Sequence, residues 1–222
     1  PCPPEFLSDK GLEPGSMRLV DETESATLYE AMAAGVEASG GSAGNTVAGI
    51  GSLGGRAAYI GKVADDQLGG VFAHDIRAAG VTFDTPVLTG GAGTGRCLIN
   101  VTPDGQRTMC TFLGAANQLA PEDLDLAQVA DSAIVYLEGY LFDPAPARAA
   151  FEAAAEAAHK ADRKVAITLS DTFVVARWRT ELLAFLDGST DIVFANEAEA
   201  CALFETDDVE AATRALAEKV EV

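Results

Sequence analysis

Strand-like and helix-like patterns alternate through the second half of the chain. Short apolar runs that suit buried strands cover residues 133–137, 164–169 and 191–195. Helical spacing of apolar residues covers 144–161, 172–186, 197–204 and 209–219. Strands that recur about every thirty residues, with helices between them, are typical of right-handed βαβ units. The pattern therefore predicts an α/β fold with a parallel sheet.

The first half of the chain predicts a different organisation. A short helix closed by a turn is expected over 5–15, and helical spacing covers 23–34, 46–53 and 67–79. Strands are expected over 16–20, 57–63, 81–88, 96–102 and 107–112. Asp104-Gly105 between the last two runs is a hairpin signal. We interpret residues 81–113 as a β-rich segment that lies outside the main α/β layer.

Polar residues follow each strand of the predicted parallel sheet. These are Glu138-Gly139-Tyr140, Ser170-Asp171 and the segment from Asn196 to Glu199. Ligands of open α/β sheets bind at the carboxyl ends of the strands. The three segments are therefore candidates for one site, although Ser170-Asp171 also suits a helix cap.

A glycine-rich stretch from Gly40 to Asn45 precedes one of the predicted helices. Gly40 and Gly41 lack side chains, so a ligand can approach the backbone closely. The amide of Asn45 can both donate and accept hydrogen bonds, which suits paired sugar hydroxyls. An ordinary glycine turn with Asn45 as helix cap explains the same residues.

Asn196 and Glu199 allow two interpretations. An amide and a carboxylate one turn apart could hold a hydrated Mg²⁺, which keeps most of its waters. A helix start with Asn196 as cap and acidic residues at the positive helix end also fits. The pattern G-x-G-x-x-G over residues 49–54 resembles a dinucleotide motif, but it ends a helical stretch instead of opening one.

The composition of the chain argues against nucleic acids, membranes and zinc as binding partners. The formal net charge is −19, and no Lys/Arg cluster indicates nucleic-acid binding. No apolar run is long enough for a membrane span and no signal peptide is visible. Four scattered cysteines without a CxxC pair argue against zinc and suit a reducing cytosol, so a cytoplasmic protein is expected.

Several motifs together resemble the PfkB family of carbohydrate kinases, which includes ribokinase and adenosine kinase. They are SGGSAGNT at 39–46, LGG at 53–55, YIGKVADD at 59–66, DGQRT at 104–108 and the N-x-x-E pattern of Asn196 and Glu199. The segment 11–21 is most similar to the adenosine-kinase branch. The resemblance implies a Rossmann-like three-layer ribokinase-type core with a parallel-rich sheet. It also implies a small β lid, formed by residues 15–21 and 81–113, with the α/β core taking the remainder of 1–222.

The resemblance also implies an activity and residue roles. The γ-phosphoryl group of ATP would move to a hydroxyl of a nucleoside or a sugar, with Mg²⁺ as the metal. Acceptor contacts are expected from Gly40, Gly41, Ser42, Asn45, Leu19, Glu138 and Tyr140. Asn196 and Glu199 would organise the phosphates, with Glu199 as the metal residue. Stacking of a base on Tyr140 is physically sensible, and a homodimer through the lid stays open.

Two family features do not occur in these residues. An Asp that grips the acceptor is expected before Pro1. A catalytic Asp in a Gly-Ala-Gly-Asp motif, with most of the ATP pocket, is expected after Val222. The 222 residues alone are therefore expected to be inactive, and a non-catalytic nucleoside- or sugar-binding fragment is the alternative. A weaker alternative is an NAD(P)-dependent oxidoreductase, based on the glycines at 49–54.

Overall fold

Three parallel strands form the core sheet of the computed structural model, which describes residues 2–222. They are β6 (Ile134–Glu138), β7 (Lys164–Thr168) and β8 (Ile192–Phe194), side by side in that order. The parallel register sets Glu138 opposite Thr168, and Thr168 opposite Phe194. The carboxyl ends of all three strands therefore lie at one edge of the sheet.

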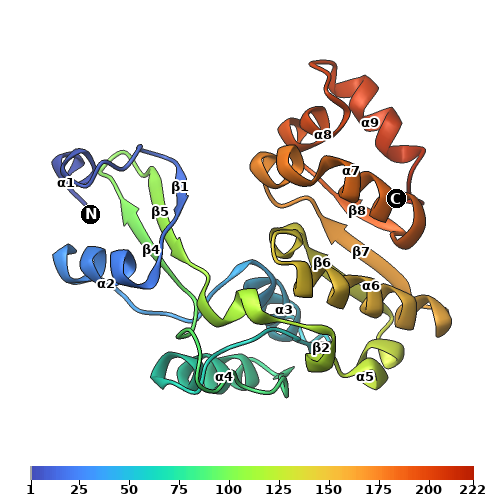
Figure 1. Ribbon diagram of the computed structural model, residues 1–222, viewed down its shortest axis with the longest axis horizontal. Coiled ribbons are helices and arrows are strands. Elements are labelled where there is room, and N and C mark those ends of the chain that lie inside the picture. The colour runs from blue at the N-terminus through green and yellow to red at the C-terminus, as the bar shows by residue number, and fades with distance from the viewer. Residues whose placement is uncertain (1) are drawn as a thin grey trace.

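Helices flank the core sheet (Figure 1). Their apolar side chains and those of the sheet form one buried cluster. The helices are α5 (Leu126–Asp131), α6 (Ala145–Lys160), α7 (Thr172–Ser189), α8 (Glu197–Phe204) and α9 (Val209–Ala217). Val165, Ile167 and Leu169 of the central strand segment are fully buried. The buried face of α6 consists largely of alanines, such as Ala150 and Ala154, which let the helix approach the sheet closely. Burial of about 25 cal/mol per Å² of apolar surface stabilises this arrangement.

A second layer carries the glycine-rich segment. It contains α3 (Ser42–Ser52), α4 (Gln67–Ala78), β2 (Ala57–Ala58) and β3 (Val81–Thr82). The strands β2 and β3 pair in parallel, and Val81 and Phe83 are buried in a cluster with Val63 and Ile76. The segment at 81–88 was expected in the lid, but its strand belongs to this layer because its apolar side chains pack under α4.

The lid sheet is separate from the core sheet (Figure 1). It consists of β1 (Met17–Leu19), β5 (Arg107–Phe112) and β4 (Arg96–Val101), in that order. The hairpin between β4 and β5 turns at Gly105, whose φ of 85° explains the glycine. Two helices, α1 (Pro4–Asp9) and α2 (Glu22–Ala31), cover one face and bury Leu98 and Cys110.

Most helices expected from the sequence are present with shifts of a few residues at their ends. The strands expected over 57–63 and 81–88 are reduced to Ala57–Ala58 and Val81–Thr82, and α5 was not expected. The helix α7 continues beyond its expected end to Ser189 and is kinked at Trp178. The indole of Trp178 donates a hydrogen bond of 2.7 Å to Asp143. Short 3-10 turns lie at Gly114–Gln118, Pro121–Asp123 and, after β6, Gly139–Phe142 (η3). None of the described helices has both the length and the apolar character that crossing a bilayer needs.

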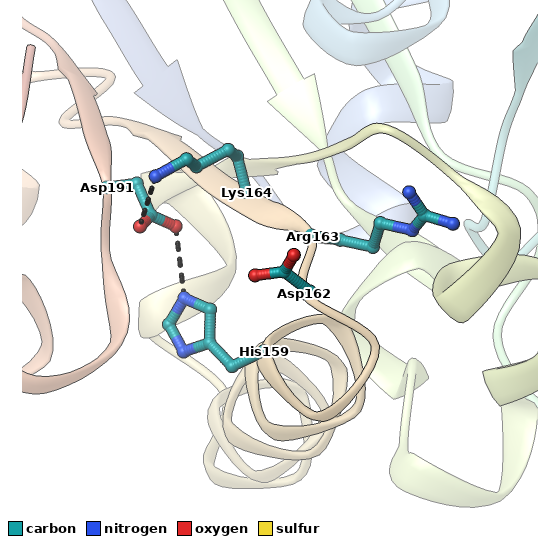
Figure 2. A pocket seen from close by; sticks show the side chains of 5 residues that line it. All are labelled: His159, Asp162, Arg163, Lys164 and Asp191. Atoms are coloured by element: carbon teal, nitrogen blue, oxygen red, sulfur yellow. Dashed lines mark hydrogen bonds and ion pairs between the residues drawn. The ribbon is translucent and has the colours of Figure 1, made fainter.

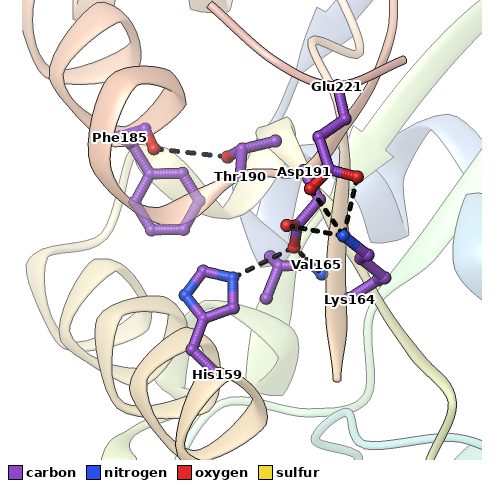
Figure 3. A network of polar contacts seen from close by, with 7 residues as sticks. All are labelled: His159, Lys164, Val165, Phe185, Thr190, Asp191 and Glu221. Atoms are coloured by element: carbon purple, nitrogen blue, oxygen red, sulfur yellow. Dashed lines mark hydrogen bonds and ion pairs between the residues drawn. The ribbon is translucent and has the colours of Figure 1, made fainter. Parts of the chain in front are cut away.

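Asp191 joins three elements at the amino ends of β7 and β8 (Figure 3). Its carboxylate accepts hydrogen bonds from the Val165 N–H at 2.7 Å and pairs with the His159 ring at 3.0 Å. Lys164 lies 3.5 Å from Asp191 and 2.6 Å from Glu221. Burial disfavours the charge of Asp191, but these partners outweigh it and hold its pKa below the ordinary value.

An open hollow of about 340 Å³ lies beside this network (Figure 2). Its lining residues carry charges of both signs and are His159, Asp162, Arg163, Lys164 and Asp191. Because it lies at the amino ends of the strands, it is distinct from the edge where α/β sheets bind ligands.

Replacement of Asp191 tests its structural role. We expect Asp191→Asn to lower the free energy of unfolding at pH 7 by about 1–3 kcal/mol, because a buried backbone donor and His159 lose their charged partner. The lowered pKa means that the stabilisation is present above pH ~4 and is lost as the pH falls through the folded-state pKa. Urea unfolding from pH 7 to pH 3 should therefore show the wild type and the variant converging.

Asp187→Asn is the matched control, because Asp187 is exposed and pairs only with Lys219 in a surface contact. It should change stability by less than about 1 kcal/mol. An Asp191→Asn variant as stable as this control at pH 7 would contradict the role of the network.

Candidate functional site

Glu138 is a buried carboxylate at the carboxyl end of β6. Its side chain is 8% exposed, and one oxygen, Oε2, accepts a hydrogen bond of 3.3 Å from the Ser170 hydroxyl. The other oxygen, Oε1, is buried and has no hydrogen-bond partner among the described residues. Buried acceptors are nearly always paired. The free Oε1 is therefore an acceptor whose partner the described residues do not supply. Because this atom is buried, a ligand hydroxyl would reach it only after the side chains over it move.

The strand ends around Glu138 are packed closely. Gly139 follows β6, and a Cβ atom at this position would lie 2.7 Å from the carbonyl oxygens of Thr168 and Leu169. Only glycine fits such an approach. Because Gly139 allows this contact, β6 ends directly beside the end of β7, and Glu138 reaches Ser170.

The glycine-rich segment meets Glu138. Burial raises the pKa of Glu138, and the nearby hydroxyls of Ser42, Ser170 and Tyr136 oppose this rise. Among the described residues, only the Ser170 hydroxyl has the distance and geometry of a hydrogen bond to this carboxylate. Burial, followed by the charge of Glu138, raises the pKa of Tyr136 to about 12, so this phenol is neutral at physiological pH. Ser42 is the first residue of α3, which places the start of that helix at the carboxyl edge of the core sheet.

The start of α3 differs from the expectation for Asn45. The helix begins at Ser42, with Gly41 as N-cap at φ 97°, a conformation that side chains rarely adopt. Asn45 therefore lies in the first helical turn, where its N–H donates to the Gly41 carbonyl, and the interpretation as helix cap is wrong. The side chains of Ser42 and Asn45 are exposed, and no Cβ contact closes the space over Gly40 or Gly41.

Asn196 and Glu199 form a capping box at the start of α8. The Asn196 side chain accepts from the Glu199 N–H at 2.8 Å, and Glu199 accepts from the backbone and side-chain nitrogens of Asn196 at 3.1 and 2.8 Å. This satisfies orphan donors at the helix start, so the helix-cap interpretation is confirmed. Glu199 is buried, and burial together with the charge of Asp171 raises its pKa.

Tyr140 lies between the two groups. Its hydroxyl donates to the Ser170 carbonyl at 3.0 Å, and its ring lies 6.3 Å from the Phe173 ring. Burial raises the pKa of Tyr140, and the charges of Asp171, Glu138 and Glu199 raise it further. Glu138 ends β6 and Asn196 follows β8 in the same parallel sheet, so both lie at its carboxyl edge.

Leu19 and Tyr140, the two predicted acceptor contacts outside the glycine-rich segment and Glu138, lie on separate elements, and their contacts with an acceptor stay predictions. Leu19 lies on β1 in the lid sheet, exposed at 42%, whereas Tyr140 belongs to η3 beside the core sheet. Tyr136 and Ser170 complete the site. Ser170 was a strand-end candidate, and Tyr136 could have been found because alternate residues of a strand share a face with Glu138.

The described residues offer limited metal ligation. They contain no group of three or more His, Cys, Asp or Glu side chains that could hold an ion. Both oxygens of Glu199 already accept a hydrogen bond from Asn196, and each keeps a further lone pair. This donor set fits the outer shell of a hydrated Mg²⁺, which retains its waters and takes few protein ligands.

Comparisons with known proteins agree with this geometry. The pattern of the pfkB family of carbohydrate kinases matches residues 16–222. The adenosine kinase of Sinorhizobium meliloti is 52% identical, with a TM-score of 0.93 over 99% of this chain and 67% of that one. A probable sugar kinase of Rhizobium etli CFN 42 is 47% identical, with a TM-score of 0.93 over the same shares. The 5-dehydro-2-deoxygluconokinase of Photobacterium profundum is 30% identical over 72% of this chain and 50% of its own.

The core sheet, the helices that flank it and the site at the strand ends are those of a ribokinase-like α/β protein. The chain belongs to the pfkB family of carbohydrate kinases. The resemblance and the fold class inferred from the sequence are therefore confirmed. The chain spans about half the length of the Photobacterium relative.

The buried charge of Glu138 has a measurable consequence for stability. We expect Glu138→Gln to raise the free energy of unfolding at pH 7 by about 0.5–2 kcal/mol. The reason is that the folded-state pKa is raised, so folding loses stability as the pH rises from the ordinary glutamate value through the folded-state pKa. The gain should disappear near pH 4, where the carboxyl is protonated in both states.

Thermal and urea unfolding at pH 4 and pH 7 would measure the difference. Glu152→Gln, an exposed position on α6, is the control and should change stability by less than about 0.5 kcal/mol. A Glu138→Gln variant less stable than wild type at pH 7 would contradict this expectation. It would show that hydrogen-bond partners outweigh the free-energy cost of burying the Glu138 charge.

Proposed function

We propose that this chain carries the acceptor-binding part of an ATP-dependent kinase that transfers the γ-phosphoryl group to a hydroxyl of a nucleoside. The observation that carries the proposal is the free, buried Oε1 of Glu138 beside the open glycine-rich segment. A hydroxyl donor at this place would satisfy the carboxylate. Family membership supports the reaction class.

The acceptor would be held by groups of complementary chemistry. Backbone at Gly40 and Gly41 allows close approach, and the exposed side chains of Ser42 and Asn45 offer hydrogen bonds to vicinal hydroxyls. The Glu138 carboxylate accepts from one hydroxyl and orients it. Positioning of this kind is the main contribution of protein residues to phosphoryl transfer.

A nucleoside is favoured over a free sugar by the aromatic side chains beside the site. Tyr140 is fixed by its hydrogen bond to Ser170 and pairs with Phe173, so a flat base can stack there. The 52% identical neighbour is described as an adenosine kinase. A sugar acceptor is the second candidate, since the 47% identical neighbour is described as a probable sugar kinase.

ATP and Mg²⁺ would bind toward the Asn196 side of the edge. Asn196 and Glu199 would contact the waters of the metal, which supplies charge neutralisation of the transferred phosphate. By resemblance, the Asp that takes the hydroxyl proton and most of the ATP pocket are expected outside these 222 residues. We therefore expect no phosphoryl transfer by residues 1–222 alone, and a purely acceptor-binding role is the alternative for this length of chain.

The lid segments would close over the acceptor and exclude water. The open face of the lid sheet carries Leu19, Ile99 and Val101, each more than a third exposed. Register places Ile99 opposite Met109 and Met109 opposite Met17, so the middle of this face is apolar, with Arg107 and Thr111 on either side of Met109. Since α1 and α2 already cover the other face, a lid-to-lid homodimer has only the open face to use.

The oxidoreductase alternative loses its basis, because the glycines at 49–54 end α3 and do not open a helix after a strand.

Calorimetric titration tests the acceptor. We expect adenosine to bind residues 1–222 and Asn45→Ala to weaken binding at least ~10-fold, because a bidentate amide contact is lost. Ser52→Ala, an exposed position at the far end of α3, should bind like wild type. Tighter binding of fructose than adenosine would favour the sugar, and ATP turnover by residues 1–222 above an Asn45→Ala background would contradict the expected inactivity.

A further inference from the structure

Ser170 has an unusual backbone conformation. Its φ is 70°, in the left-handed region that non-glycine residues adopt rarely and at a cost of about 1–3 kcal/mol. The other two non-glycine residues with positive φ in the described chain, Asp162 and Glu205, follow helix ends, where this conformation is common. Ser170 instead follows a β-strand. The end of a helix therefore does not explain the left-handed conformation of Ser170.

Ser170 contacts Glu138 and Tyr140 of the site, and its hydroxyl also lies 3.4 Å from the carbonyl oxygen of Thr168 at the end of β7. Its hydroxyl lies 3.3 Å from Oε2 of Glu138, and its carbonyl accepts the Tyr140 hydroxyl at 3.0 Å. Its N–H donates to Oγ1 of Thr168 at 3.3 Å. The left-handed turn thus directs the hydroxyl to the buried carboxylate and the carbonyl to the phenol. A relaxed backbone would redirect both groups.

We propose that Ser170 is a positioning residue for the acceptor: its hydroxyl holds one oxygen of Glu138 so that the other oxygen stays free for an acceptor hydroxyl. The inference rests on the proposed function and extends it. Neither the pattern of polar residues after each strand nor the description of the family assigns this role to Ser170. A carboxylate held at only one oxygen keeps its direction and still leaves a lone pair for the ligand.

The titratable groups around Glu138 also support a carboxylate that Ser170 holds at one oxygen. The titratable groups that face Glu138 are the phenols of Tyr59 after β2, Tyr136 on β6 and Tyr140 on η3, and the pKa of each is raised. Hydroxyls of Ser42 on α3, Ser170 after β7 and Tyr136 favour the charged carboxylate against burial. Removal of the Ser170 hydroxyl should therefore raise the pKa of Glu138 further and leave its direction less defined.

Two substitutions separate the hydroxyl from the backbone strain. Ser170→Gly removes the hydroxyl and relieves the strain, whereas Ser170→Ala removes the hydroxyl and keeps the strain. We expect both to weaken adenosine binding about 3- to 10-fold at pH 7. Both should also move the acid limb of the binding–pH profile to higher pH. Ser170→Gly should nevertheless be at least as stable as Ser170→Ala in urea. A merely structural serine would not produce a matching pH shift in the two variants.

The carboxyl carbon of Glu138, followed by ¹³C NMR without ligand, provides a second measurement. Its titration midpoint should rise in both variants and stay unchanged in Thr172→Ala, an exposed hydroxyl two residues away that contacts Asp171. Normal adenosine affinity and an unchanged pH profile in Ser170→Gly and Ser170→Ala would overturn the role of Ser170 and leave the proposed function intact. Absence of adenosine binding by the unchanged chain would overturn both.

Discussion

The parallel pairing of β6 and β7 is the constraint on which the candidate site depends. It sets Glu138 opposite Thr168, and Gly139 lets the two strand ends approach without a side chain between them. The carboxylate is thereby removed from water and brought to the Ser170 hydroxyl. One backbone register therefore decides the burial, the hydrogen bonding and the raised pKa of the same side chain.

The two ends of the core sheet use charge differently. At the amino ends, Asp191 is surrounded by donors and its pKa is lowered, so its charge stabilises the fold. At the carboxyl ends, Glu138 and Glu199 are buried with raised pKa values, so their charges oppose folding. Retention of unfavourable charge at one edge is characteristic of functional sites, where ligands supply the missing partners.

The apolar open face of the lid sheet and the polar edge of the core sheet complement each other in chemistry. Under the proposed function, the flat base of a nucleoside would meet the first surface and its hydroxylated sugar would meet the second. The lid carries Leu19 on a different sheet from Tyr140, so enclosure of a base between them would require the sheets to approach each other. This division would explain why the proposed acceptor-binding residues come from distant parts of the sequence.

Much of the secondary structure and the fold class could be predicted from local pattern. Alternation of buried strands and amphipathic helices after residue 121 depends only on neighbouring side chains, and α8 was expected at its observed bounds. Prediction was weaker where tertiary packing decides the outcome. The segment at 81–88 has the composition of a lid strand, yet Val81 and Phe83 pack beneath α4. Asn45 has the composition of a helix cap, yet Gly41 holds the cap position.

The sequence by itself determined which residue types follow each strand, and hence that polar groups gather at one sheet edge. Only the tertiary structure decided how those groups are paired: Asn196 and Glu199 satisfy each other, whereas Glu138 keeps one oxygen free. Hydrogen-bond satisfaction depends on the directions of side chains from separate elements, such as Ser42 on α3 and Ser170 after β7. Sequence spacing does not encode these directions across long separations, because they arise from the packing of α3 and the sheet.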